Sequence, residues 1–278
     1  MTKPLTYLYD DPADLAHFLP FSASRPIGEL RYGAHLLRER WGLAGFGPIA
    51  GHLARAHLTD FRESDAPPVV ATSERRAIFL RSAFVPASEE RGLVMGADAD
   101  GVRLVDAAGN TVGAAVAADR AWTGPGGIPA DWPTTVLPGK LLGGAWDIIA
   151  DLLPALREDI ANEAVLRDEQ DARLPAGCTI LGDAEDLLID ATAVIEPMVV
   201  LDTRGGPIWI QAGAEIRSLS RLAGPLVVGR GTRIVGGQLR ESSIGPMCVV
   251  HGELSNSVFL GYANKSHDGF LGHSMIGR

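Results

Sequence analysis

Cysteine, positive charge and long apolar runs are all scarce in this chain, and each scarcity excludes a class of protein. The two cysteines, Cys178 and Cys248, are far apart and have neither a metal-binding nor a redox spacing, so we interpret both as small buried residues. The net charge of −9 and the pI near 5.3 argue against nucleic acid or an anionic membrane as a partner.

The chain also lacks the apolar segments that direct a protein to a membrane or anchor it there. No run of about eighteen apolar residues occurs, and the first ten residues contain no apolar core of a signal peptide. A cytoplasmic location is therefore the simplest prediction. The 278 residues, of which 46% are hydrophobic and 21% charged, are typical of a globular protein with room for two domains.

A regular aliphatic repeat fills the last hundred or so residues. From about Cys178 onward an aliphatic residue returns every five to eight positions, usually before a small residue or a glycine. The clearest occurrences are Ile189, Ile195, Leu201, Val228, Ile244, Leu260, Leu271 and Ile276. A period near six fits neither an amphipathic helix nor an alternating strand. It predicts a parallel β-helix, in which each turn adds aliphatic side chains to an interior stack and glycines occupy the corners.

The first half of the chain predicts an α/β domain. We expect a strand over Leu5–Tyr9 that ends in an acidic turn at Asp10 and Asp11. Further strands are expected over 77–85 and 92–105, the second with an Asp-rich turn.

Proline and glycine suggest where this half is irregular. Pro26 disfavours helix at the residue before it, so we expect an exposed loop over 22–25. Apolar residues at helical spacing then predict a helix over about 30–41. Residues 122–140 are rich in proline and glycine and should form another loop.

The two halves are joined by a helical segment. Apolar residues from Trp146 onward keep helical spacing, and Pro154 either kinks that helix or lies in the first turn of a second one. The polar stretch 168–176 is where we place the domain boundary. The predicted domains are therefore 1–170, with the helix at its end, and 177–278.

Two segments resemble a known family. The segment 24–41 begins Ser-Arg-Pro-x-x-Glu-Leu-Arg-x-Gly and ends Glu-Arg-Trp, and 264–277 reads Asn-Lys-Ser-His-Asp-Gly-Phe-Leu-Gly-x-Ser-x-Ile-Gly. Together they resemble the GlmU-like sugar nucleotidyltransferases. The second segment is also similar, more distantly, to the acetyltransferase half of the bifunctional N-acetylglucosamine-1-phosphate uridylyltransferase. The resemblance thins out between about residues 50 and 139.

The resemblance implies a fold and a class of reaction. The expected fold is a reduced nucleotidyltransferase-like α/β domain followed by a left-handed parallel β-helix of hexapeptide repeats, assembled as a homotrimer. The expected activity is a transferase of nucleotide-sugar or cell-envelope precursor metabolism. Its partners would be a sugar-1-phosphate and a nucleoside triphosphate or nucleotide sugar, and Mg²⁺ would be its cofactor.

The expected nucleotide site departs from the family pattern. Related enzymes open with a glycine-rich loop that cradles the triphosphate, whereas residues 21–25 stand in its place without those glycines. Arg25 and Arg31 are our candidates to compensate through phosphate contacts and to stabilise the charge that develops. The alternative is that Arg25 is solvated and that Glu29 and Arg31 are charges in the first turn of a helix. The other expected substrate-binding residues are Glu29 and Gly33, and the expected magnesium ligands are Asp10 and Asp11.

The expected acyltransferase site lies where the β-helix rhythm is interrupted, and we predict an extended loop over 262–270. In the resembling acetyltransferases the residue at the position of His267 is the general base that takes a proton from a sugar amine. The alternative is that His267 and Asp268 only stabilise a corner. The expected substrate-binding residues are Asn264, Phe270 and Lys265, the last through a phosphate.

Other interpretations stay open at this stage. The chain stops within a predicted coil, so we expect a fragment whose further coils would bind acetyl-CoA. The missing glycine-rich loop favours a non-catalytic scaffold or sensor that binds nucleotide sugars. A β-helix carbonic anhydrase-like zinc site would use His251, His267 and His273, although their spacing is not that of the zinc family.

Overall fold

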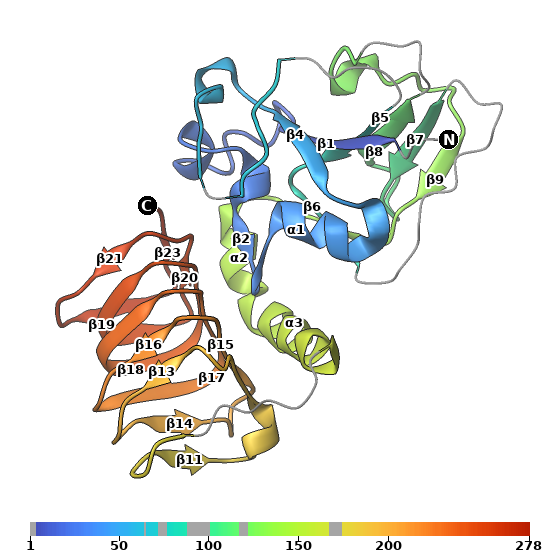
Figure 1. The fold of residues 1–278 in the computed structure, drawn as a ribbon. Helices are drawn as coiled ribbons and strands as arrows, with labels where there is room; N and C mark the ends of the chain where they lie inside the picture. Colours follow the sequence, from blue (N-terminus) through green and yellow to red (C-terminus); the bar gives the residue numbers. More distant parts are fainter. Residues whose placement is uncertain (1–3, 64, 72–76, 88–100, 117–121, 167–173) are drawn as a thin grey trace. The chain divides into compact units, whose positions relative to one another are not determined.

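The computed structural model describes residues 4–63, 65–71, 77–87, 101–116, 122–166 and 174–278. They form two compact units (Figure 1), the first comprising Met1–Leu30 with Leu36–Ala145 and the second Arg31–His35 with Trp146–Arg278. The second unit thus includes the helical segment that we expected at the end of the first domain.

In the described residues, the first unit is built on a six-stranded sheet with the order β4-β1-β5-β8-β7-β9. The strands are β1 (Leu5–Tyr9), β4 (Ile49–Leu53), β5 (Ala77–Arg81), β7 (Gly101–Val105), β8 (Thr111–Val116) and β9 (Thr134–Val136). β4, β1 and β5 are parallel, whereas β8 is antiparallel to β5 and β7. The carboxyl ends of the three parallel strands therefore meet at one edge, which is where open α/β sheets bind ligands.

Alternation along these strands sends apolar side chains to both faces of the sheet. Leu8 and Leu80 pack on one face in a cluster that includes Trp41. On the other face Phe79 stacks on Trp122 with ring centroids 4.2 Å apart. Because both faces are covered by apolar groups, polar chemistry is concentrated at the ends of the strands.

The remaining elements of the N-terminal part are short. They are β2 (Arg31–Tyr32), β3 (His35–Leu36), α1 (Leu37–Trp41), β6 (Phe84–Pro86), β10 (Gly139–Leu141), a π turn at Gly42–Phe46 and 3-10 turns at Phe21–Ala23, Ile27–Glu29, Ala56–Leu58 and Pro125–Gly127. β1, β5 and β6 confirm the predicted strands over 5–9 and 77–85. The predicted strand over 92–105 is confirmed in β7, and its expected turn falls within 88–100, outside the described residues. The predicted loop over 122–140 contains β9.

The structure corrects two predictions around Pro26. The predicted helix over 30–41 is helical only at α1, because β2 and β3 pair as a hairpin that turns at Gly33 with a φ of +63°. Glycine adopts this left-handed conformation without steric cost, so the turn overrides the apolar spacing. The predicted exposed loop over 22–25 is exposed only at Ala23 and Ser24. A 3-10 turn covers Phe21–Ala23, and Ser22 and Arg25 are buried, with the Ser22 hydroxyl donating to the Leu15 carbonyl at 2.7 Å.

The second unit consists of two helices and a parallel β-solenoid of about five turns over residues 179–276. α2 (Ala145–Ala150) is followed by α3 (Leu152–Leu166), and Pro154 lies in the first turn of α3, as one of the two predicted alternatives. The solenoid strands are β11 (Thr179–Leu181), β12 (Leu187–Ile189), β13 (Val194–Ile195), β14 (Val200–Asp202), β15 (Ile208–Ile210), β16 (Glu215–Ile216), β17 (Ser220–Val228), β18 (Arg233–Ile244), β19 (Val249–Ser255), β20 (Val258–Phe259), β21 (Asn264–Lys265), β22 (Phe270–Gly272) and β23 (Met275–Ile276).

The register of the solenoid confirms the predicted repeat. One outward row runs through Thr179, Val200, Arg221, Gln238, Glu253 and Phe270, so successive coils are between 15 residues (Gln238 to Glu253) and 21 residues (Thr179 to Val200) apart. The next residue in each coil continues a second row, which points inward at Leu201, Leu222, Leu239, Leu254 and Leu271, whereas Ile180 in the first coil is 37% exposed. The interior is therefore an unbroken aliphatic stack.

A second face of the solenoid is covered within its own unit. Its outward residues Trp209, Val227 and Ser243 are buried, and α3 packs against the two strands β17 and β18. The Ser243 hydroxyl donates to the Gly33 carbonyl at 2.6 Å, and the Ala34 N–H donates to Asp159 of α3 at 2.8 Å. The tip of the β2–β3 hairpin is thus fixed by hydrogen bonds to α3 and to the solenoid.

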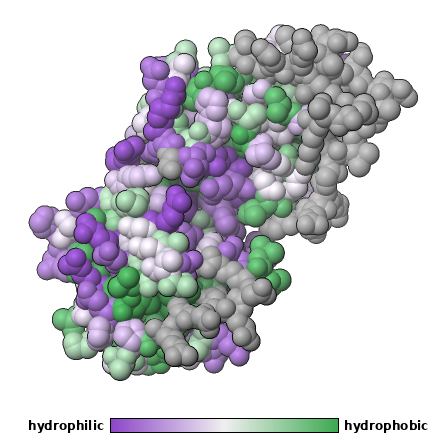
Figure 2. Space-filling model, viewed as in Figure 1, coloured by the Kyte–Doolittle hydropathy of each residue, from purple (hydrophilic) through white to green (hydrophobic). Residues whose placement is uncertain are grey.

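None of the helices in the described part of the chain has the length and apolar character needed to span a bilayer. The surface in Figure 2 mixes hydrophilic and hydrophobic residues. This mixture agrees with the 21% charged and 46% hydrophobic composition.

Candidate functional sites

The carboxyl edge of β1, β4 and β5 gathers the acidic side chains that follow β1. Asp10 lies directly after β1, and its N–H donates to the Leu53 carbonyl at the end of β4. On the other side Ser82, directly after β5, donates its N–H to the Tyr9 carbonyl. The three strand ends are therefore held together by backbone hydrogen bonds beside Asp10.

Asp10 is a buried carboxylate, 9% exposed. Both of its carboxylate oxygens accept the Ile27 N–H, each at 3.2 Å. Burial raises the pKa of Asp10 to about 6, against weaker lowering effects that include the nearby His52. No described side chain forms an ion pair with it. A cation would offset the cost of burying this charge.

The neighbouring acidic residues are already paired. Arg81 at the end of β5 binds Asp14 in a bidentate ion pair, with distances of 2.8 Å from Nε and 2.6 Å from Nη2. Asp11 Oδ2 lies 3.8 Å from the Arg81 Nε, and Asp11 Oδ1 accepts the Ala13 N–H. Asp10 and Asp11 thus lie side by side in the chain but differ in their surroundings. Among the described residues no group of three or more His, Cys, Asp or Glu is arranged to hold a metal.

Arg25 is buried rather than solvated, with 5% of its surface exposed. Its two terminal nitrogens bind the carboxylate of Glu63 at 3.1 and 2.9 Å, and its guanidinium lies 5.9 Å from the centre of the Phe61 ring. The bidentate pair holds the guanidinium in one orientation. A phosphate that binds Arg25 must therefore share it with Glu63 or displace Glu63.

The other residues of the predicted nucleotide site are divided between the two units. Glu29 belongs to the first unit and is enclosed by Arg38 and His52, at 2.8 and 2.7 Å. Arg31 and Gly33 belong to the second unit: Arg31 donates to the Ala34 carbonyl, and the Gly33 carbonyl accepts from Ser243. His52 was not predicted from the sequence, because it is an isolated histidine within a strand that carries no motif.

The predicted acyltransferase loop is smaller than expected. The extended loop over 262–270 is wrong, because β21 pairs in register with Val249 and Val250 of the coil below. Only 266–269 bulges from the corner. Lys265 takes an interior position above Val250, and its ammonium donates to the carbonyls of His251, His267 and Gly269 at 2.6, 3.1 and 2.9 Å. An ammonium has three donors, so a phosphate at Lys265 would have to replace one of these carbonyls.

His267 lies on this corner and is exposed. Its neighbour Asp268 pairs with His251, Nδ1 to Oδ1 at 3.2 Å, and not with His267. The imidazole of His267 is therefore open to a ligand, while its backbone carbonyl is fixed by Lys265. Asn264 is exposed on the adjoining row, opposite Val249. No three of the described histidines, cysteines and carboxylates converge at a metal-like site, so the zinc interpretation gains no support.

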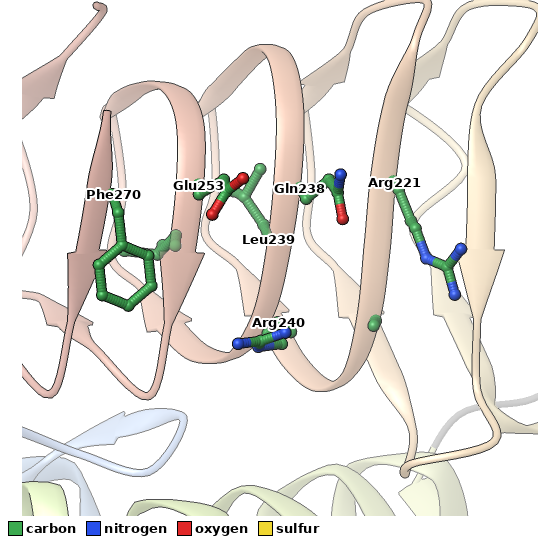
Figure 3. Close-up of a pocket in the computed structure, with 8 residues that line it drawn as sticks. Arg221, Gln238, Leu239, Arg240, Glu253 and Phe270 are labelled. Atoms are coloured by element: carbon green, nitrogen blue, oxygen red, sulfur yellow. The ribbon is translucent and has the colours of Figure 1, made fainter. Parts of the chain in front are cut away.

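A groove of about 380 Å³ lies on the outward row that ends at Phe270 (Figure 3). Its lining residues are Arg221, Ala223, Gln238, Leu239, Arg240, Glu253, Leu254 and Phe270. Figure 3 shows Phe270 at one end of the row and Arg221 at the other, with Glu253 and Gln238 between them. The volume is in the lower part of the range for small-molecule sites.

The side chains that line the groove carry a net positive charge, although the chain as a whole is acidic. Its lining contains two guanidinium groups and one carboxylate. Arg221 binds Asp202 at 2.6 Å, and hydrogen bonds from Arg204 hold the pKa of Asp202 well below its usual range. Arg240 donates to the Ser255 hydroxyl at 3.1 Å and pairs with no described acidic side chain. Phe270 is 64% exposed and offers an apolar ring. The groove thus suits a small anion that carries a ring.

Comparison with known proteins identifies the first part of the chain. Residues 6–165 match the protein family described as sugar nucleotidyl transferase. The match covers more than half of the 278 residues, and Asp10, Arg25 and Glu29 all lie within it. No curated protein matches the chain.

Proposed function

We propose, from the premise that the chain belongs to the sugar nucleotidyl transferase family, that its first unit joins a nucleotide to a sugar-1-phosphate. A phosphate oxygen of the sugar-1-phosphate would attack the α-phosphorus of a nucleoside triphosphate. The bond from that phosphorus to the β-phosphate would break, giving a nucleotide sugar and pyrophosphate. The observation that carries the proposal is Asp10, a buried carboxylate that pairs with no cationic side chain among the described residues and is placed where parallel strands end.

The residues at this edge fit a magnesium ion. Mg²⁺ prefers oxygen ligands and is usually held by one or two carboxylates together with substrate phosphates, so a cluster of three protein ligands is not needed. Asp10 is the better candidate, since Asp11 faces Arg81. When bound, the ion would neutralise the phosphate charges as pyrophosphate leaves. Asp10 itself would orient that ion through oxygens that Ile27 already fixes.

Turnover tests the proposal most directly. Pyrophosphate release would be measured with magnesium across a panel of nucleoside triphosphates and sugar-1-phosphates. Pyrophosphate that depends on both substrates supports a transferase. Binding of a nucleotide sugar without turnover under any pairing would instead support the scaffold or sensor interpretation.

Arg25 supplies a test of the phosphate contact. We expect Arg25→Met to lower kcat by about 100-fold or more, because a preorganised guanidinium then no longer meets the developing charge. The matched variant is Glu63→Gln, which weakens the same buried pair from the other side and keeps the guanidinium. Both variants should lose stability, whereas turnover should fall steeply only in Arg25→Met. Equal losses of turnover would mean that the pair is structural.

A second candidate function concerns the solenoid, and the positive groove that ends at Phe270 favours it. Phe270 would pack against a sugar ring and Arg240 would bind its phosphate. His267, three residues before Phe270 in the chain, would take a proton from a sugar amine as the amine attacks an acyl thioester such as acetyl-CoA. The new bond joins nitrogen to the acyl carbon, the carbon–sulfur bond breaks, and the thiol leaves.

Thiol release measures this second activity. We expect His267→Asn to lower the rate by about 100-fold. The control is His273→Asn, which removes a second exposed histidine from the next part of the coil. Equal rates in the two variants would remove His267 from the reaction.

A further inference from the structure

A buried cluster in the first unit, formed by Glu29, Arg38 and His52, has no role in the reaction described so far. Glu29 Oε1 lies 2.7 Å from Nε2 of His52 and 2.8 Å from Nε of Arg38. The side chain of Glu29 is 1% exposed and that of His52 is 0% exposed. A substrate cannot reach a carboxylate that is enclosed in this way. Its contribution must therefore come from the residues that it holds in place.

One turn of backbone connects the cluster to Asp10. The Ile27 N–H donates to both Asp10 oxygens at 3.2 Å. The next residue, Gly28, lies directly against the imidazole of His52, because a Cβ at this position would stand 2.8 Å from Cε1 of that ring. Glu29 follows and binds the same ring through its side chain. Three successive residues thus contact Asp10 or His52.

Electrostatic contacts hold the three side chains of the cluster in place. Burial alone would raise the pKa of Glu29, but the contacts with His52 and Arg38 outweigh it and lower that pKa below its usual value. Nδ1 of His52 has no hydrogen-bond partner among the described residues, so the ring depends on Glu29 for its orientation. Loss of either partner would leave the others buried and unpaired, which proteins tolerate poorly.

We propose that Glu29 and His52 are positioning residues that hold the Ile27 N–H against the Asp10 carboxylate and thereby fix the direction of that carboxylate. The proposal rests on the proposed function, in which Asp10 orients the metal–nucleotide complex. It gives Glu29 a role different from the substrate contact that the sequence predicts.

The first experiment needs no substrate. Amide hydrogen exchange at Ile27 would be measured in the full chain for wild type, Glu29→Gln and His52→Gln. We expect exchange about tenfold faster or more in both variants, because the turn then opens more often. The matched control is Glu39→Gln. Glu39 is 40% exposed and 3.7 Å from Arg38, so this change touches the same arginine from outside and should leave Ile27 unchanged.

The second readout separates positioning from substrate contact. In pyrophosphate release, Glu29→Gln and His52→Gln should lower kcat about tenfold or more with KM for both substrates within about threefold of wild type. Unchanged exchange at Ile27, or a raised KM with kcat retained, overturns the proposal. If one variant does not fold, the other decides.

The two proposals can fail separately. If Ile27 exchanges faster in the variants but the wild type releases no pyrophosphate, the positioning role of Glu29 and His52 stands and the proposed function is overturned. If Ile27 exchanges as slowly in the variants as in the wild type and the wild type releases pyrophosphate, the proposed function stands and the positioning role is overturned.

Discussion

Replacing Asp10 by asparagine should lower the rate of pyrophosphate release about 100-fold or more and, in the metal-free protein at pH 8, raise the free energy of unfolding. The wild-type carboxyl group has a pKa of about 6 in the folded state, against about 3.9 when unfolded. Between these values the folded chain binds a proton that the unfolded chain does not. Stability therefore falls as the pH rises from about 4 to 6 and stays reduced by about 3 kcal/mol above that window.

Asparagine removes this penalty and keeps an oxygen that accepts the Ile27 N–H. Urea unfolding at several pH values would measure the difference. The gain from Asp10→Asn should be close to its full size above pH 7 and about half as large at pH 5. The control is Asp14→Asn, which gives up the bidentate pair with Arg81 and should lose stability at pH 8. A loss of stability in Asp10→Asn that grows toward low pH would contradict the argument.

The second part of this prediction concerns magnesium binding and turnover. Magnesium chloride should raise the urea concentration at the midpoint of unfolding of the wild type at pH 8, because a ligand that binds only the folded state stabilises that state. It should leave the midpoint of Asp10→Asn unchanged, and turnover of that variant should fall about 100-fold or more. A gain in stability combined with a loss of activity is the expected mark of a residue kept for chemistry.

The sequence predicted what depends on local repetition. An aliphatic residue in every coil sufficed for the solenoid, because Leu222, Leu239 and Leu254 repeat one environment along the stack. Strand β1 and the acidic residues that follow it were also predicted from the local sequence. The hairpin at Gly33 was missed because a single left-handed glycine outweighed a helix-like spacing.

The candidate site was less predictable because it depends on pairs that are distant in the chain. Arg25 was recognised, but its partner Glu63 lies 38 residues away. Glu29 was recognised as well, and its partner His52 lies 23 residues away, on a strand whose position only the fold reveals. Lys265 fitted a motif, whereas its interior position became visible only from the register with Val250. Motifs thus located the residues, and tertiary contacts determined what each side chain can reach.

The solenoid allows a second prediction of large effect, from two residues adjacent in the chain. Leu239 points inward between Leu222 and Leu254 and is 1% exposed, whereas Gln238 points outward into the groove. Leu239→Ala should lower the free energy of unfolding by about 2–5 kcal/mol, because a coil touches only its two neighbours and cannot easily refill the cavity.

Gln238→Ala is the matched control for this prediction and should change stability by less than about 0.5 kcal/mol. Circular dichroism during urea unfolding would follow the solenoid strands in both variants. Ligand affinity should show the reverse order. Gln238→Ala removes an amide that points into the groove and should weaken binding more than Leu239→Ala, because the leucine points inward and only supports the wall that carries Phe270 and Arg240. Equal stability losses would mean that the two rows are assigned to the wrong faces. The groove, which is built on the outward row, would then have to be reassigned with them.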